Sequence, residues 1–434
     1  AAASGLRFDF SAQGEAFTII DSAGSHTLVG GAGADTISAG GGHDTVVGGD
    51  GDSIDAGEGS DVVVYVSGVA RVDGGATVAG DVDRLVLAAS ITSFDLGAQV
   101  SAGQVSGFEV IDARDVVGAI TIRGSGGGES ILGGAAGSSI DGGDGPAGTE
   151  DYIKLGNGSN VVVYHAGDTV LGGTGVDRVE LSDSGVTRFS LSTITINSVT
   201  YAADPVSGVE VLDGSMRTAA ITIAGSTAGE TILGGSGADA IDGFGGADSI
   251  GAGLGADTVH FHGTEQRVDG GVGDVDRLVL VNTSFDYAQG KAVGFEVLDA
   301  RGSTGAVTIK GSSGAESIFA SAHGDSIDGG LGADYIKLGA GADTVVYHAA
   351  ATVDGSAGGG EDRLVLSDQS VTSLTIDATL TGLEIVDGSM RPGSITIRGS
   401  GVGESMLGGA GADSLVGDAG DDYLIGGTGK DTLY

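Results

Sequence analysis

The sequence predicts an all-β protein folded as an elongated parallel β-solenoid, in which stacked Gly/Asp-rich nonapeptide coils alternate with β-rich interludes. Three observations support this prediction: a repeat of nine residues, a longer repeat of about 86–101 residues, and 87 glycines among 434 residues. Tryptophan and cysteine are absent, and aromatic residues make up 5% of the chain. A chain so poor in bulky side chains favours thin, repeated layers of Ile, Val and Leu over one compact core.

The short repeat approximates G-G-x-G-x-D-x-U-x, where U is a large aliphatic residue. From Gly234 the chain reads GGSGADAID, GFGGADSIG and AGLGADTVH. Gly and Asp followed by a short β-branched run predict a turn and then a strand. If two nonapeptides form one coil, carboxylates eighteen residues apart converge between neighbouring coils. The expected pairs are Asp239 with Asp257, Asp325 with Asp343, and Asp413 with Asp431.

The long repeat divides the chain into five Gly/Asp blocks and the interludes between them. The blocks cover about residues 26–65, 129–162, 230–260, 316–347 and 404–434. Each interlude carries a VDRLVL-like, a GFEVLDAR-like and an ITIRGS-like segment, and we interpret its Asp-Arg pair, such as Asp83-Arg84, as a structural ion pair. No linker or shift in composition breaks the pattern, so we expect one continuous repeat domain over residues 1–434.

The charge excludes several classes of function. There are 59 acidic against 19 basic residues, a net charge of −40, which disfavours nucleic acid and anionic membranes as partners. No apolar run approaches the roughly 20 residues of a membrane-spanning helix. The seven histidines lack a catalytic context, and G-x-S-x-G, H-E-x-x-H and phosphate-loop motifs are missing, so we expect a protein that is not an enzyme.

The repeated turns predict a metal. Like charges that converge in stacked turns repel each other unless a cation lies between them, and carboxylate and carbonyl oxygens are the ligands that Ca²⁺ selects. The scarcity of histidine and the absence of cysteine disfavour zinc or copper in these turns. We therefore expect several calcium ions.

The nonapeptides resemble the calcium-binding repeats of the RTX (repeats-in-toxin) family, and the interludes are loosely similar to RTX-type bacterial surface-layer proteins. The resemblance implies a parallel β-roll, secretion, and calcium held between adjacent turns. Glu129, Glu230, Glu316 and Glu404 open their blocks with a longer side chain, and Ser138 and Asn160 replace Asp, so weaker or empty sites are expected there. By position, the implied ligands are Asp35, Asp44, Asp52, Asp61, Asp239, Asp248, Asp257, Asp325, Asp334, Asp343, Asp413, Asp422 and Asp431, with carbonyls such as those of Gly31, Gly33, Gly235 and Gly237.

These features predict a secreted, extracellular or cell-surface structural protein that binds calcium and assembles into a surface layer, sheath or filament. The repeats reach both ends of the sequence without a cap, and exposed strand edges favour a homo-polymer formed by end-to-end or lateral packing. Two alternatives remain open. One is a calcium-stiffened adhesin stalk or ligand-binding module, with a cell-surface glycan as partner. The other is the RTX secretion passenger region of a larger protein.

Overall fold

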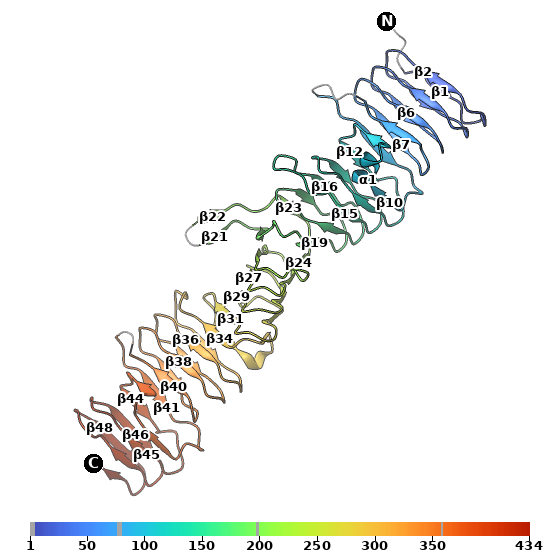
Figure 1. Ribbon diagram of the computed structural model, residues 1–434. Coiled ribbons are helices and arrows are strands. Elements are labelled where there is room, and N and C mark those ends of the chain that lie inside the picture. Colours follow the sequence, from blue (N-terminus) through green and yellow to red (C-terminus); the bar gives the residue numbers. More distant parts are fainter. Residues whose placement is uncertain (1–4, 76–79, 197–198, 357–358) are drawn as a thin grey trace. The chain divides into compact units, whose positions relative to one another are not determined.

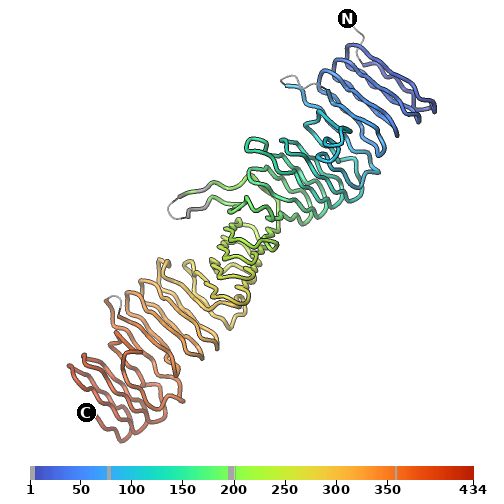
Figure 2. The backbone as a smooth tube through the Cα atoms, viewed as in Figure 1, coloured from blue at the N-terminus to red at the C-terminus, as the bar shows by residue number. Residues whose placement is uncertain are grey.

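The computed structural model describes residues 5–75, 80–196, 199–356 and 359–434. The chain divides into two compact units, residues 1–216 and 217–434, each a stack of short parallel strands (Figure 1). The backbone trace shows successive coils lying one upon another within each unit (Figure 2). The predicted all-β parallel solenoid is confirmed. The prediction of a single continuous domain over 1–434 stays a prediction.

The first unit contains three rows of hydrogen-bonded parallel strands. The longest row is β1 (Arg7–Asp9), β3 (Thr27–Val29), β5 (Thr45–Val47), β7 (Val62–Tyr65), β9 (Arg84–Leu87), β12 (Val110–Asp112), β14 (Ser130–Leu132), β16 (Tyr152–Lys154), β18 (Thr169–Leu171) and β23 (Val206–Ser207). A second row is β2 (Thr18–Ile20), β4 (Thr36–Ser38), β6 (Ser53–Asp55), β8 (Arg71–Asp73) and β11 (Val105–Ser106). The third is β10 (Ser93–Asp95), β13 (Thr121–Arg123), β15 (Ser139–Asp141), β17 (Val161–Val163), β19 (Arg178–Glu180) and β24 (Val211–Asp213).

The second unit repeats this plan. One row is β25 (Thr222–Ala224), β27 (Ala240–Asp242), β29 (Thr258–Phe261), β31 (Arg277–Leu280), β34 (Val297–Asp299), β36 (Ser317–Phe319), β38 (Tyr335–Lys337), β40 (Thr352–Asp354) and β43 (Leu380–Thr381). Another is β32 (Phe285–Asp286), β35 (Thr308–Lys310), β37 (Ser326–Asp328), β39 (Thr344–Val346), β41 (Arg363–Val365), β44 (Ile385–Asp387), β46 (Ser405–Gly409) and β48 (Tyr423–Gly427). Two shorter rows are β26 (Thr231–Leu233), β28 (Ser249–Gly251), β30 (Arg267–Asp269) and β33 (Ala292–Val293), and β42 (Ser373–Thr375), β45 (Thr396–Arg398), β47 (Ser414–Val416) and β49 (Thr432–Leu433).

The core is a stack of single aliphatic side chains. Most strands have three residues, and the central one points inward because side chains alternate across a strand. The register places Leu28 beside Val46 and Val46 beside Val63, and all three side chains are fully buried. Thr27 pairs with Thr45, eighteen residues on, so two nonapeptides form one coil as predicted.

Among the described residues, three segments add secondary structure other than parallel coils. A short helix, α1 (Leu96–Ser101), follows β10, with the side chain of Asp95 accepting a hydrogen bond from Ala98 N at its start. A 3₁₀ turn, η1 (Tyr287–Gln289), occupies the corresponding interlude of the second unit. After β20 (Arg188–Ser190), strands β21 (Ile194–Ile196) and β22 (Val199–Tyr201) pair antiparallel and leave the stack of the first unit as a hairpin (Figure 1).

Candidate functional site

The repeated turns bring each coil into close contact with the next through glycine. Gly253 has φ +112°, and a Cβ atom on it would lie 2.1 Å from the carbonyl oxygen of Gly235, one coil earlier. Gly255 stands in the same relation to the carbonyl of Gly237, at 2.3 Å. Only glycine fits such a backbone approach with positive φ. The repeated glycines therefore set the close stacking of the turns.

The aspartates at the sixth repeat position form ladders that run along the stack. In each step, the backbone N–H of one acidic residue donates to a carboxylate oxygen of the equivalent residue in the next coil. The predicted pairs are brought together: Asp239 N lies 2.7 Å from Asp257 Oδ1, Asp325 N 2.6 Å from Asp343 Oδ1, and Asp413 N 3.0 Å from Asp431 Oδ1. In the first unit the equivalent bonds are Asp35 N to Asp52 Oδ1 at 2.8 Å and Asp44 N to Asp61 Oδ1 at 2.7 Å.

The remaining predicted aspartates also accept a bond from the preceding coil. Asp248 Oδ1 accepts from Glu230 N at 2.8 Å, Asp334 Oδ1 from Glu316 N at 3.0 Å, and Asp422 Oδ1 from Glu404 N at 2.9 Å. In these ladders the earlier residue is the glutamate that opens a block. All thirteen aspartates named from the sequence thus take part in bonds between coils.

The ladders extend into the interludes, which the sequence analysis missed. Asp61 N donates to Asp83 Oδ1 and Asp83 N donates to Glu109 Oε2, both at 2.8 Å. The second unit repeats the arrangement twice, through Asp276 with Glu296 and through Asp362 with Glu384. The sequence signal that could have revealed these ladder positions was the Glu of each GFE-like segment, which recurs once in every long repeat.

The Asp-Arg interpretation is therefore wrong about the acidic partner. Asp83 belongs to a ladder, whereas Arg84 pairs with Asp112, whose carboxylate also binds Arg114. The same holds for Arg277, which pairs with Asp299 beside Arg301. Burial raises the pKa of the Asp112 carboxyl, but the hydrogen bonds and charges of the two arginines outweigh it and hold the pKa below its usual value.

Many ladder carboxylates have one satisfied and one unsatisfied oxygen. Among the described residues, several buried second oxygens have no hydrogen-bond partner; they include Oδ2 of Asp44, Asp61, Asp83, Asp151, Asp248, Asp257, Asp334, Asp343 and Asp413. Burial raises the pKa of Asp61 and of Asp248 to about 7 and that of Asp343 to about 6. Such groups are stable at neutral pH only when protonated or paired with a cation.

In several turns this second oxygen lies over a glycine of the same turn. A Cβ atom on Gly243 would lie 2.6 Å from Asp248 Oδ2, and one on Gly329 would lie 2.6 Å from Asp334 Oδ2. In other turns the oxygen is taken by the next backbone N–H, as when Gly31 donates to Asp35 Oδ2 at 2.9 Å and Gly235 to Asp239 Oδ2 at 2.6 Å. The carboxylate thus fills the space that a side chain would occupy.

Three of the four carbonyl groups named from the sequence, those of Gly31, Gly235 and Gly237, lie at boundaries between coils. The Gly31 and Gly237 oxygens point toward the glycines of the next coil. The Gly235 oxygen accepts a hydrogen bond from Leu254 N at 2.9 Å. Gly33 lies against the backbone of Glu15 and Ala16 in the coil before it. At Gly49, a Cβ atom would lie 2.6 Å from the Gly31 carbonyl oxygen and 3.7 Å from Asp52 Oδ2, so a carbonyl lies near a ladder carboxylate there.

The carboxylates of the glutamates that open the blocks accept hydrogen bonds from a nearby serine. The Glu230 side chain reaches back to Ser226, whose backbone N–H and hydroxyl both donate to it. Ser125 with Glu129, Ser312 with Glu316, and Ser400 with Glu404 repeat the contact. In the block at 129–162, Ser138 N donates to Asn160 Oδ1 at 2.7 Å, so a neutral residue holds a ladder position there.

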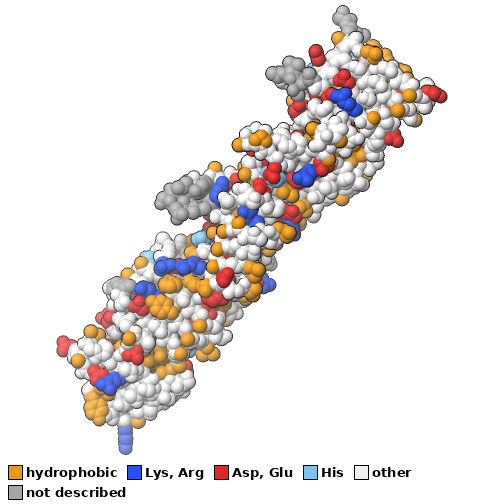
Figure 3. Space-filling view, in the orientation of Figure 1, with side chains coloured by type: hydrophobic (Ala, Val, Ile, Leu, Met, Phe, Trp, Pro, Cys, Tyr) orange, Lys and Arg blue, Asp and Glu red, His pale blue; other side chains and the backbone are white. Residues whose placement is uncertain are grey.

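The face drawn in Figure 3 carries little continuous acidity. In the space-filling view, acidic side chains are scattered over the visible face (Figure 3), although the chain has a net charge of −40. Asp61 and Asp248 are fully buried. Much of the negative charge is therefore placed inside the turns.

Comparison with known families identifies most of the same Gly/Asp blocks. A family model of the RTX calcium-binding nonapeptide repeat matches residues 22–55, 225–259, 310–345 and 398–434. The chain carries RTX calcium-binding nonapeptide repeats. The four matched segments contain, in whole or in part, four of the five Gly/Asp blocks, while the block at 129–162, with its neutral Ser138 and Asn160, lies outside them. No curated protein matches the chain, and among the described residues no helix is long and apolar enough to cross a membrane.

Proposed function

We propose that calcium ions bind along the carboxylate ladders and that the protein folds around them. The observation that carries this proposal is the set of buried carboxylate oxygens without a hydrogen-bond partner among the described residues, which in seven cases belong to predicted ligands: Asp44, Asp61, Asp248, Asp257, Asp334, Asp343 and Asp413. The proposed ligands are Asp35, Asp44, Asp52, Asp61, Asp239, Asp248, Asp257, Asp325, Asp334, Asp343, Asp413, Asp422 and Asp431, with the carbonyls of Gly31, Gly33, Gly235 and Gly237.

When bound, calcium supplies positive charge to carboxylates such as those of Asp61 and Asp248, whose pKa burial raises to about 7. The chain's own residues set the spacing of the coils. The Oδ1 atoms fix the distance between coils through the N–H groups of the preceding coil, and the glycines let the turns approach closely. The ladders thereby link the stacking of coils to neutralisation of their charge.

We further propose that the protein is an extracellular, non-enzymatic structural protein that assembles into a surface layer, sheath or filament. The repeats occupy both units, and the solenoid presents parallel strand rows suited to packing against further copies. Low cytosolic and high external calcium would delay folding until after secretion. Electron microscopy in millimolar CaCl₂ and after EDTA tests assembly: ordered polymers only with calcium are expected, and dispersed particles in both conditions contradict it.

One observation favours the alternative of a ligand-binding stalk. The β21–β22 hairpin is an antiparallel insertion between parallel coils, and the corresponding segments of two other interludes are the short helical turns α1 and η1. Deleting the hairpin distinguishes the ligand-binding stalk from the assembling structural protein. A stalk would lose binding to a glycan array while calcium-dependent folding is unchanged, whereas a polymer without that role would keep its assembly.

A further inference from the structure

Three histidines occupy the same place in successive repeats. The Nε2 atoms of His165, His262 and His348 lie 2.9, 2.8 and 2.9 Å from Oδ1 of Asp141, Asp242 and Asp328, respectively. Each aspartate ends a strand, β15, β27 or β37, in a coil before the histidine. A carboxylate that holds one ring nitrogen orients the ring and leaves the other nitrogen to face outward from this pair.

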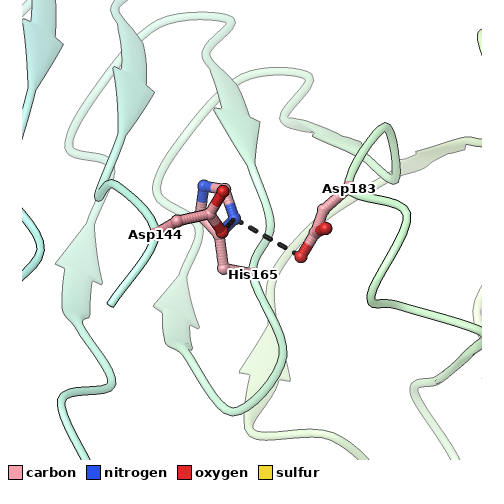
Figure 4. A group of neighbouring side chains, drawn as sticks. All are labelled: Asp144, His165 and Asp183. Carbon is pink, nitrogen blue, oxygen red and sulfur yellow. Dashed lines mark ion pairs between the residues drawn. The ribbon is translucent and has the colours of Figure 1, made fainter. Parts of the chain in front are cut away.

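His165 is distinguished by what its other nitrogen faces. Its Nδ1 lies 2.7 Å from Asp144 Oδ1 and 3.5 Å from Asp183 Oδ2, and the three side chains converge from different coils (Figure 4). Asp144 belongs to the insertion after β15, and Asp183 follows β19. One ligand atom from each residue can be chosen such that all lie within 4.8 Å of one another.

We propose that Asp144, His165 and Asp183 bind one divalent transition-metal ion of the zinc class, at a site separate from the calcium ladders. An imidazole nitrogen with two carboxylates is a donor set that such ions accept and that calcium, which selects oxygen, does not favour. Asp141 supplies the second contact that metal-binding histidines commonly make. Three protein ligands leave a fourth position of a tetrahedral ion for water.

The distances suit a small ion. At typical zinc–nitrogen and zinc–oxygen bond lengths, the ligand atoms of a tetrahedral site lie about 3.3 Å apart. The two distances from His165 Nδ1, 2.7 and 3.5 Å, lie on either side of this value. Within the described structure the buried Nδ1 makes no well-aligned hydrogen bond, despite the nearby Asp144 oxygen. A metal ion between these atoms would satisfy the nitrogen.

Carboxylates lie on both sides of the ring, with Asp141 at Nε2 and Asp144 and Asp183 at Nδ1. Asp144 is 80% exposed, so the site opens to solvent on that side. An ion can therefore reach the ring without unfolding of the coil.

The chain contains two incomplete copies that serve as internal controls. The segment IDGGDG around Asp144 corresponds to IDGGLG, in which Leu331 replaces Asp144, and to IDGFGG, in which Gly245 does. Beside His348, Asp368 takes the place of Asp183 at 3.9 Å from Nδ1. In the third copy Asn282 stands where Asp183 does. Of these three copies, the one with the insertion combines all three donors.

The test uses Co²⁺ as the probe on the full chain, folded in millimolar CaCl₂ so that the ladders are occupied. Equilibrium dialysis gives the stoichiometry, and Co²⁺-induced broadening of ¹⁵N signals from the histidine rings identifies the ligand. We expect one ion per chain and broadening of the His165 ring. Asp144→Gly, which copies the sequence at Gly245, should weaken binding at least about 10-fold, and His348→Ala should leave it unchanged.

A gain-of-site variant sharpens the test. Leu331→Asp places a carboxylate beside His348 and Asp368 and should raise the stoichiometry from one ion to two. Unchanged circular dichroism in each variant shows that the calcium-dependent fold is intact. The proposal is overturned if His165→Ala binds Co²⁺ as the parent does, if the parent shows no saturable binding, or if Leu331→Asp gains none.

Discussion

The backbone N–H of Asp44 donates a 2.7 Å hydrogen bond to Oδ1 of Asp61, the equivalent residue one coil further along. The same aspartate position thus serves two purposes. One carboxylate oxygen joins the coils, while the other remains buried without a partner, as Asp61 Oδ2 does among the described residues. Because the two oxygens have different roles, mutations can separate the hydrogen-bonding and charge contributions of this carboxylate to stability.

Substitutions at Asp248 separate the two contributions. Asp248→Ala leaves Glu230 N without its acceptor, and an unsatisfied buried N–H costs about 1–3 kcal/mol. We expect a loss of that size in the free energy of unfolding, measured by denaturant titration in CaCl₂. Asp248→Asn keeps an acceptor, as Asn160 does naturally, and should retain the stacking but weaken calcium binding. The exposed Glu361 provides the control, and Glu361→Ala should have neither effect.

Acid should partly replace calcium. Burial raises the pKa of Asp61, Asp151 and Asp248 to about 7 in the folded chain, above the ordinary value near 3.8. The folded state therefore binds more protons between these values, and stability is greatest at low pH and is lost as the pH rises through about 7. In EDTA, we expect the chain to gain β structure, measured by circular dichroism, on acidification from pH 8 to 5. A loss of β structure over this range would contradict the burial of uncompensated carboxylates.

Glycines within one coil should differ sharply in their tolerance of alanine. At Gly253, with φ +112°, a Cβ would lie 2.1 Å from the Gly235 carbonyl, so Gly253→Ala must displace the backbone and should cost about 2 kcal/mol or more. Gly251 in β28 meets only Leu233 Cδ2, at 3.5 Å, and Gly251→Ala should be nearly neutral. Thermal denaturation in CaCl₂ compares them. Equal effects would show that turn stacking does not limit stability.

The ion pairs of the interludes predict a second contrast. Asp299 binds both Arg277 and Arg301, whereas Asp387 pairs with Arg363 and accepts a backbone bond from Ser389. Removing Arg277 leaves Asp299 with an arginine, so Arg363→Ala should destabilise the protein by about 1–2 kcal/mol more than Arg277→Ala. Chemical denaturation of both variants measures this. A larger loss in Arg277→Ala would rule out compensation by Arg301.

The sequence predicted the features that follow strict periodicity. The coil of eighteen residues and the convergence of Asp239 with Asp257 follow from nine-residue spacing and are confirmed. Asp83 and Glu109 were missed because 26 residues separate them, a distance set by an interlude that contains α1. Their place in the ladder depends on the length of the interlude, because the interlude determines which residue of the next coil lies beside Asp83.

The histidine cluster was beyond sequence reasoning for a related reason. His165 and Asp144 are brought together by an insertion that breaks the repeat, so no fixed spacing marks them. The antiparallel β21–β22 pair likewise has no counterpart in the periodic pattern. Periodicity predicts what repeats, whereas these features arise where the chain departs from it.

Calcium titration of the EDTA-treated chain, followed by far-ultraviolet circular dichroism with equilibrium dialysis in parallel, tests the central claim most directly. The ladders predict a chain with little β structure at first, then a cooperative gain of β structure as several calcium ions bind per chain. A chain that keeps its full β spectrum in excess EDTA at pH 8, and binds no calcium at millimolar concentration, would contradict the account.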